Sequence, residues 1–131
     1  MTDLIAFLTA RLDEDEAAAK AAWGVEWDWR YVAQPFGERP SIAHTVHIAR
    51  HDPARILREV EAKRAIVGIY AGTLALVEHP LVIKEGQFAG KINARDYLDA
   101  KRELAVLKPA VEALAAVYRD HPDYRQEWGN G

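Results

Sequence analysis

The chain contains no cysteine, and this absence excludes several kinds of chemistry. Disulfide bonds, thiolate metal sites and cysteine nucleophiles all need a sulfur atom that the sequence does not supply. Long hydrophobic runs are also absent, since no apolar stretch approaches the roughly 18 residues that a membrane-spanning helix needs. The N-terminus lacks the basic region of a secretory signal. We therefore expect a cytoplasmic protein with no membrane contact.

Catalytic and nucleotide-binding signatures are missing from the sequence as well. It has no G-x-S-x-G turn for a serine nucleophile, no phosphate-binding GxxxxGK[ST] loop and no G-x-G-x-x-G fingerprint. The 17 basic and 20 acidic side chains are spread along the chain, for a net charge of −3. Nucleic-acid binding needs a concentrated positive field, so it is not expected. We predict no catalytic residues and favour a binding protein over an enzyme.

The composition is that of one globular domain. Half of the 131 residues are hydrophobic and 28% are charged, which excludes a disordered chain. A chain of this length buries enough surface for one core. We therefore expect a single domain over residues 1–131.

Three segments have the apolar spacing of helices. Residues 2–22 begin with leucines at positions 4, 8 and 12, which form one helical stripe. Asp52 followed by Pro53 predicts the start of a helix over 53–79. A third helix is expected over 94–119, where Pro109 should kink it or split it in two. Its apolar seam over 97–118 predicts a helical hairpin with the preceding helix, and self-association through that seam is the alternative.

Residues 25–31 have the alternating pattern of a strand with one buried face. Val25, Trp27, Trp29 and Tyr31 point one way, whereas charged residues point the other. Residues 81–84 and 87–92 are candidate partner strands. The predicted fold class is therefore α+β: a helix-dominated domain with a small antiparallel sheet of two or three strands and a long helical hairpin. The alternative is that the aromatic strand forms an exposed patch for a partner.

Three histidines have spacing that suits a metal ion. His44, His47 and His51 are three and four residues apart, so a continuous helix would present them on one face. Neutral imidazoles at such spacing can bind zinc. The alternative, which we favour, is that these side chains cap, donate hydrogen bonds or face solvent. We therefore expect no cofactor, with zinc as the alternative.

One basic segment is the best candidate for a partner surface. The candidate residues of this segment are Arg50, Arg55, Arg58 and Arg64. Trp128, the tryptophan of the last predicted turn, is added to them as a candidate. Interspersed acidic residues make a solvated, self-paired helix face the competing interpretation.

A resemblance adds context to these patterns. The blocks "HIARHDPARILREVEAKR" and "DHPDYRQEW", with "MTDLIAFLTARLDEDE" at the start, resemble a family of small proteins of unknown function from actinobacteria and their phages. The resemblance implies a small interaction or regulatory protein, an accessory factor of a phage or mobile element that binds an unidentified protein. A histidine-based metal protein or hydrolase and a weak nucleic-acid binder are the alternatives. In place of residues 66–97, members of that family often have a shorter connection that carries cysteines. The absence of cysteine here means that no cysteine-dependent role is implied.

Overall fold

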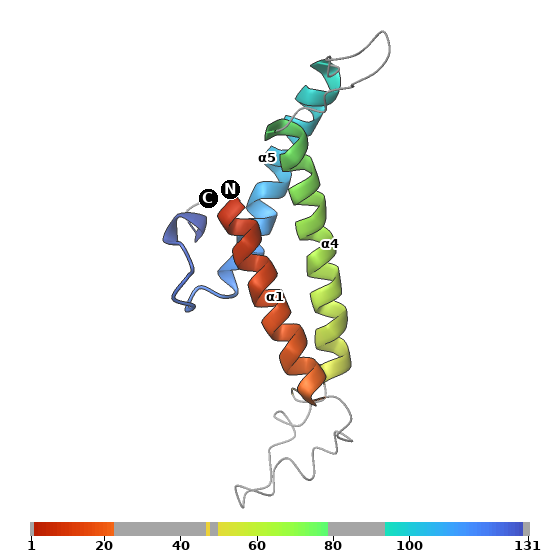
Figure 1. Cartoon of the computed structure of the whole chain (residues 1–131), viewed down its shortest axis with the longest axis vertical. Helices are drawn as coiled ribbons and strands as arrows, with labels where there is room; N and C mark the ends of the chain where they lie inside the picture. The colour runs from red at the N-terminus through yellow and green to blue at the C-terminus, as the bar shows by residue number, and fades with distance from the viewer. Residues whose placement is uncertain (1, 23–46, 48–49, 79–93, 130–131) are drawn as a thin grey trace, which may run out of the picture. The chain divides into compact units, whose positions relative to one another are not determined.

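The computed structural model describes residues 2–22, 47, 50–78 and 94–129, and the regular structure among them is helical (Figure 1). Helix α1 spans Thr2–Ala22, α4 spans Pro53–Glu78 and α5 spans Ala94–Ala116. A short 3-10 helix, η2, covers Gln126–Gly129. The three helices expected from apolar spacing are confirmed, α1 with the expected bounds and the other two within three residues at each end.

The predicted α+β class is wrong. No strand occurs in the described ranges, and the elements found there are helices. The segments expected to be strands, 25–31, 81–84 and 87–92, lie outside the described residues. The physical reason for the correction is that each of the three long helices buries apolar side chains on one side without a sheet.

The chain divides into two compact units, residues 1–11 with 63–131 and residues 12–62. Both α1 and α4 continue from one unit into the other, so this division does not test the expectation of a single domain.

The first unit has a core made by helix faces. Its described core consists of apolar side chains that are each at most 8% exposed: Leu4, Phe7, Leu8, Val67, Tyr70, Leu74, Ala100, Val111, Ala115 and Trp128. The α4 members are three or four residues apart, as one face of a helix requires. This spacing is the pattern that predicted the helix.

The second unit contains the start of α4, where the chain provides the predicted cap. The Asp52 carboxylate accepts a hydrogen bond from the backbone N–H of Arg55 at 2.8 Å. The carbonyl of Asp52 accepts from the N–H of Ile56 at 3.1 Å. Pro53 occupies the first helical position, where its missing N–H leaves no donor unpaired. Among the described residues of this unit, Leu12, Ala19 and Val60 form the buried apolar core.

Helices α4 and α5 both continue through residues that disfavour helix. Gly68 and Gly72 do not stop α4, which continues to Glu78. Pro109 does not split α5, so that part of the expectation is wrong. Proline removes the N–H that would bond the carbonyl of Ala105, and Ala105 is exposed, so water can satisfy that carbonyl.

None of the helices in the described part of the chain combines the length and the apolar character that crossing a bilayer requires.

Candidate functional site

The C-terminal segment lies beside the start of α1 (Figure 1). Aromatic rings from the two segments are in contact. Phe7 is the common neighbour: its ring centroid lies 5.0 Å from that of Trp128, 6.0 Å from Tyr124 and 6.3 Å from Tyr118. The rings of Tyr118 and Tyr124 meet Phe7 edge to face, whereas the Trp128 ring is tilted by 46° from it. Edge-to-face geometry at these separations is favourable. We call Phe7, Tyr118, His121, Tyr124 and Trp128 the aromatic cluster.

Arg11 extends the aromatic cluster from the next turn of α1. Its Nη1 donates to the imidazole of His121, with 2.6 Å between Nη1 and Nδ1. The guanidinium also lies 5.3 Å from the centre of the Phe7 ring, within the range of a cation–π interaction. Arg11 is only 7% exposed. A buried guanidinium needs such partners, so this arrangement holds residue 121 against α1.

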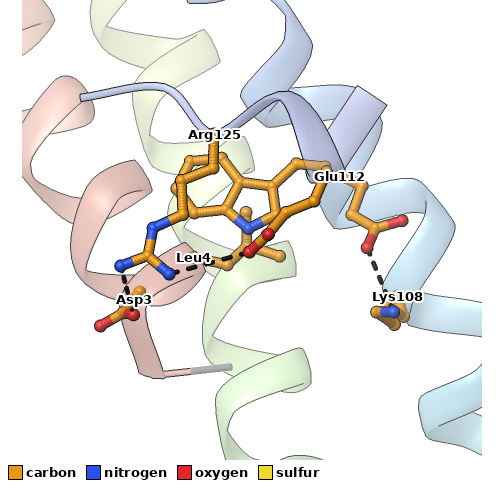
Figure 2. Close-up of a pocket in the computed structure, with 7 residues that line it drawn as sticks. Asp3, Leu4, Lys108, Glu112 and Arg125 are labelled. Carbon is orange, nitrogen blue, oxygen red and sulfur yellow. Dashed lines mark ion pairs between the residues drawn. The ribbon is translucent and has the colours of Figure 1, made fainter. Parts of the chain in front are cut away.

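A small pocket of about 240 Å³ lies beside this cluster, between the first turn of α1, α5 and the C-terminal segment (Figure 2). Arg125 points toward Asp3, with 2.7 Å between Nη2 and Oδ2, and its Nη1 is 3.7 Å from Glu127. On the other side Lys108 and Glu112 form an ion pair at 3.3 Å. Leu4 and Trp128 supply apolar walls.

The charges of this pocket pair mainly with one another. Three carboxylates face two cations, and each carboxylate has a cation within 4 Å. A phosphate site would need an excess of cations, and a metal site would need converging carboxylates not already paired with cations. Of these ion pairs, the one between Arg125 and Asp3 joins the C-terminal segment to α1. A neighbouring hollow of about 290 Å³ shares Asp3, Arg125 and Trp128 with it.

Tyr70 is the most deeply buried polar side chain near α5. Burial raises the pKa of its hydroxyl above 10.0, and the negative charges of Glu112 and Glu78 raise it further. Glu112 is itself 7% exposed. Ionising the phenol would place a second negative charge near a buried carboxylate. Tyr70 is therefore a neutral core residue at ordinary pH.

The arginines predicted to form a partner surface occupy two units. Arg50 and Arg58 are exposed in the second unit, and Arg55 there is half-buried. Nε of Arg55 donates to Glu59 at 2.9 Å, the self-paired arrangement that was the competing interpretation. Arg64 is half-buried and belongs to the first unit. Their role in binding a partner stays a prediction.

The remaining predicted site residues are Trp128 and the three histidines. Trp128 is 8% exposed and packs on Phe7, so it is a core residue of the first unit. His47 and His51 lie side by side, with 4.4 Å between ring centroids. His44 lies outside the described residues. Among the residues that the structure describes, no three potential metal ligands form a group.

Helix α4 has an exposed face that the sequence analysis did not single out. From Ala65 to Val77 the helix carries no charged side chain. On its outer side Ile69 is 59% exposed, Leu76 38% and Ile66 36%. Small residues separate them, and these are exposed too: Ala65, Gly68, Gly72 and Ala75. We call these seven residues the α4 apolar face.

The sequence contained a signal for some of the features that were missed, but not for all of them. The α4 apolar face follows from the uncharged run, because a helix buried on one side must expose the apolar residues of its other side. Phe7 and Arg11 are four residues apart on α1, and such pairs meet on a helix surface. Their contact with His121 spans most of the chain, so no local pattern could have indicated it.

Comparison with known proteins places the chain at the level of a family. No curated protein and no solved structure matches it. A protein-family model, described as a family of unknown function, matches residues 1–130. The expected resemblance to a family of unknown function is confirmed at that level, whereas the actinobacterial and phage source stays a prediction. The chain belongs to DUF6221, a family of unknown function.

Proposed function

We propose that this protein is a small intracellular interaction or regulatory protein that acts by binding another protein chain, as an accessory factor of a phage or mobile element. The observation that supports binding is the α4 apolar face. Single exposed apolar residues are common on protein surfaces and need no explanation. Three large ones on one face of an uncharged helical run form a contiguous surface of the kind that proteins bury against partners.

The exposed apolar residues of α5 provide a comparison. Leu98 is 52% exposed and Val106 is 76% exposed, but they are more than two helical turns apart. Charged residues 101–103 lie between them and are exposed. These two residues are scattered surface positions, so they serve as matched controls for the α4 apolar face.

Site-specific photo-cross-linking in cells tests the proposal. Ile69 is replaced by p-benzoylphenylalanine in one variant and Val106 in another, and both chains are irradiated and examined by mass spectrometry. The proposal expects a defined protein cross-linked at position 69 and none at position 106. Equal yields at both positions, or no product at position 69 from a well-expressed chain, would contradict it.

A metal-binding role is a second candidate, favoured by the adjacent rings of His47 and His51. Two imidazoles at i and i+4 can bind one zinc ion when further ligands complete the shell. Zinc titration followed by calorimetry is the test, with His47→Ala as the variant and His121→Ala as the control outside the pair. Stoichiometric binding lost only in His47→Ala supports the role, and binding absent from the unmodified chain excludes it.

A further inference from the structure

We propose that His47 and His51 bind one zinc ion together with the same two residues of a second copy of this chain, so that the metal joins the two chains. This inference rests on the metal-binding role proposed for the same pair, and it names what completes the site. Structural zinc is almost always held by four ligands in a tetrahedron. Two imidazoles from each of two chains supply that number, and a two-fold axis through the metal relates them.

The pair has the geometry that chelation of one ion needs. The backbone N–H of His51 donates to the carbonyl of His47 at 3.1 Å, the i to i+4 bond of a helical turn. This turn brings the two imidazoles to one side of the chain, with 4.4 Å between ring centroids. Two nitrogen ligands of a tetrahedral zinc ion are about 3.4 Å apart, and adjacent rings can each place one nitrogen at that separation.

The carboxylates that follow the pair along the chain are already engaged. The Asp52 carboxylate accepts from the backbone N–H of Arg55 at 2.8 Å, as the cap of α4. Glu59, the next carboxylate in the sequence, lies 2.9 Å from Nε of Arg55. Within the described ranges no third potential ligand joins the two histidines. Half of a zinc shell is therefore present, and it needs ligands from another source.

A second copy supplies those ligands in an arrangement that already exists. Both histidines are exposed, so another chain can reach them. Imidazole suits zinc well, and each further imidazole replaces a bound water. A shell of four imidazoles therefore holds the ion more tightly than a shell of two, and this difference is the driving force for joining two chains.

The charges beside the pair leave association to the metal. Arg50 and Asp52 flank His51 in the sequence and carry opposite charges. The charge of Arg55 is offset by Glu59. The groups nearest the pair in the sequence thus cancel, so they neither steer two copies together nor hold them strongly apart. We therefore expect a dimer that depends on zinc.

The seam over 97–118, which was predicted as the route to self-association, differs in this respect. Ala100 and Val111 are buried, and its other members are half-buried: Tyr97, Leu104, Leu107, Leu114 and Tyr118. Association through these apolar residues would need neither zinc nor the histidines. The response to zinc therefore distinguishes the two routes.

Sedimentation equilibrium of the full chain at increasing zinc concentration is the first test. The chain is expected to be monomeric after treatment with a chelator and dimeric at about half an equivalent of zinc per chain. A large excess of zinc should restore monomers, because each pair then holds an ion of its own by mass action. Cobalt in place of zinc should show the strong visible absorption of a four-coordinate ion at the same stoichiometry.

Substitutions of the histidines locate the site. His47→Ala and His51→Ala are each expected to raise the dissociation constant of the zinc-dependent dimer by at least about tenfold, since two chains then offer two imidazoles instead of four. His44→Ala is the matched control, because it removes an imidazole from the same part of the sequence, and it should leave the constant unchanged. Circular dichroism of each variant establishes that it is folded.

The possible results separate this inference from the roles proposed above. A complex of one chain with one zinc ion, lost in His44→Ala, would overturn the bridge and keep the metal-binding role. No zinc binding by the unmodified chain would reject both. A dimer that forms equally well without zinc would also reject the bridge and would favour the seam. Partner binding through the α4 apolar face is independent of all three results, since its test is the cross-link at position 69.

Discussion

Arg125 and Asp3 form an ion pair of 2.7 Å that joins the C-terminal segment to the first turn of α1. The same guanidinium lies 6.0 Å from the centre of the Trp128 ring and 3.7 Å from Glu127. Two kinds of interaction thus hold the segment, exposed ion pairs and the aromatic cluster. Their strengths differ because water screens the first and is excluded from the second.

The ion pair is expected to contribute little to stability. The side chains of Asp3 and Arg125 are 58% and 53% exposed, so solvent weakens their attraction. Asp3→Asn should lower the free energy of unfolding by less than about 1 kcal/mol, and the loss should shrink further in high salt. Urea unfolding at low and high salt measures both effects. A salt-independent loss of several kcal/mol would contradict the expectation.

The aromatic cluster is expected to carry most of the stability of this contact. Trp128 is 8% exposed, and its removal would leave a cavity beside Phe7. Trp128→Ala should cost about 3 to 5 kcal/mol in the free energy of unfolding, the range for truncating a large buried ring.

Val117→Ala is the matched control for that truncation, because Val117 is 67% exposed. Its cost should stay within about 0.5 kcal/mol, as for most surface substitutions. Similar losses for Trp128→Ala and Val117→Ala would mean that the ring does not hold the segment. Because Trp128→Ala is expected to destabilise the fold, any loss of partner binding in this variant is interpreted only together with a measurement of its folding.

The N-terminal cap of α4 gives a third prediction. The Asp52 carboxylate satisfies the N–H of Arg55, one of the donors that a helix start leaves without an intrahelical partner. Asp52→Ala should cost about 1 kcal/mol, whereas Asp52→Asn should keep most of the stability, since asparagine caps nearly as well. Thermal unfolding of the three proteins measures the difference. Equal losses of stability in Asp52→Ala and Asp52→Asn would show that the cap is not the source of the stabilisation.

The helices could be predicted because their signals are local. The α4 core positions Val60, Val67, Tyr70 and Leu74 follow helical spacing, and each is buried. The cap at Asp52 depends on residues three positions apart. Such patterns depend on the geometry of one helix, and sequence shows them directly.

Features that join distant segments could not be predicted in the same way. The contact between Arg11 and His121 depends on how the chain returns to α1, and no spacing encodes it. Trp128 was assigned to a partner surface on its residue type, which does not distinguish a buried ring from an exposed one. The α+β prediction depended on alternation in residues 25–31 and on partner strands over 81–84 and 87–92, which lie outside the described residues, whereas the described ranges form helices.

The burial of Tyr70 predicts how stability changes at alkaline pH. Its folded-state pKa is raised, first by burial and then by Glu112 and Glu78. As pH rises through about 10, the unfolded chain loses the phenolic proton while the folded chain keeps it. The unfolded state then binds fewer protons, so the free energy of unfolding falls with rising pH. The contribution of Tyr70 to the free energy of unfolding is fully present below about pH 10 and is lost as the pH rises toward the folded-state pKa of its hydroxyl.

Tyr70→Phe removes this proton and should flatten the decrease above pH 10, as measured by urea unfolding between neutral and alkaline pH. Tyr97→Phe is the control, because Tyr97 is a half-buried phenol on α5. The two variants should differ in the slope of the free energy of unfolding against pH, and not only in its value at neutral pH. An unchanged slope in Tyr70→Phe would show that other groups control the alkaline transition, since the slope counts the difference in protons bound by the two states.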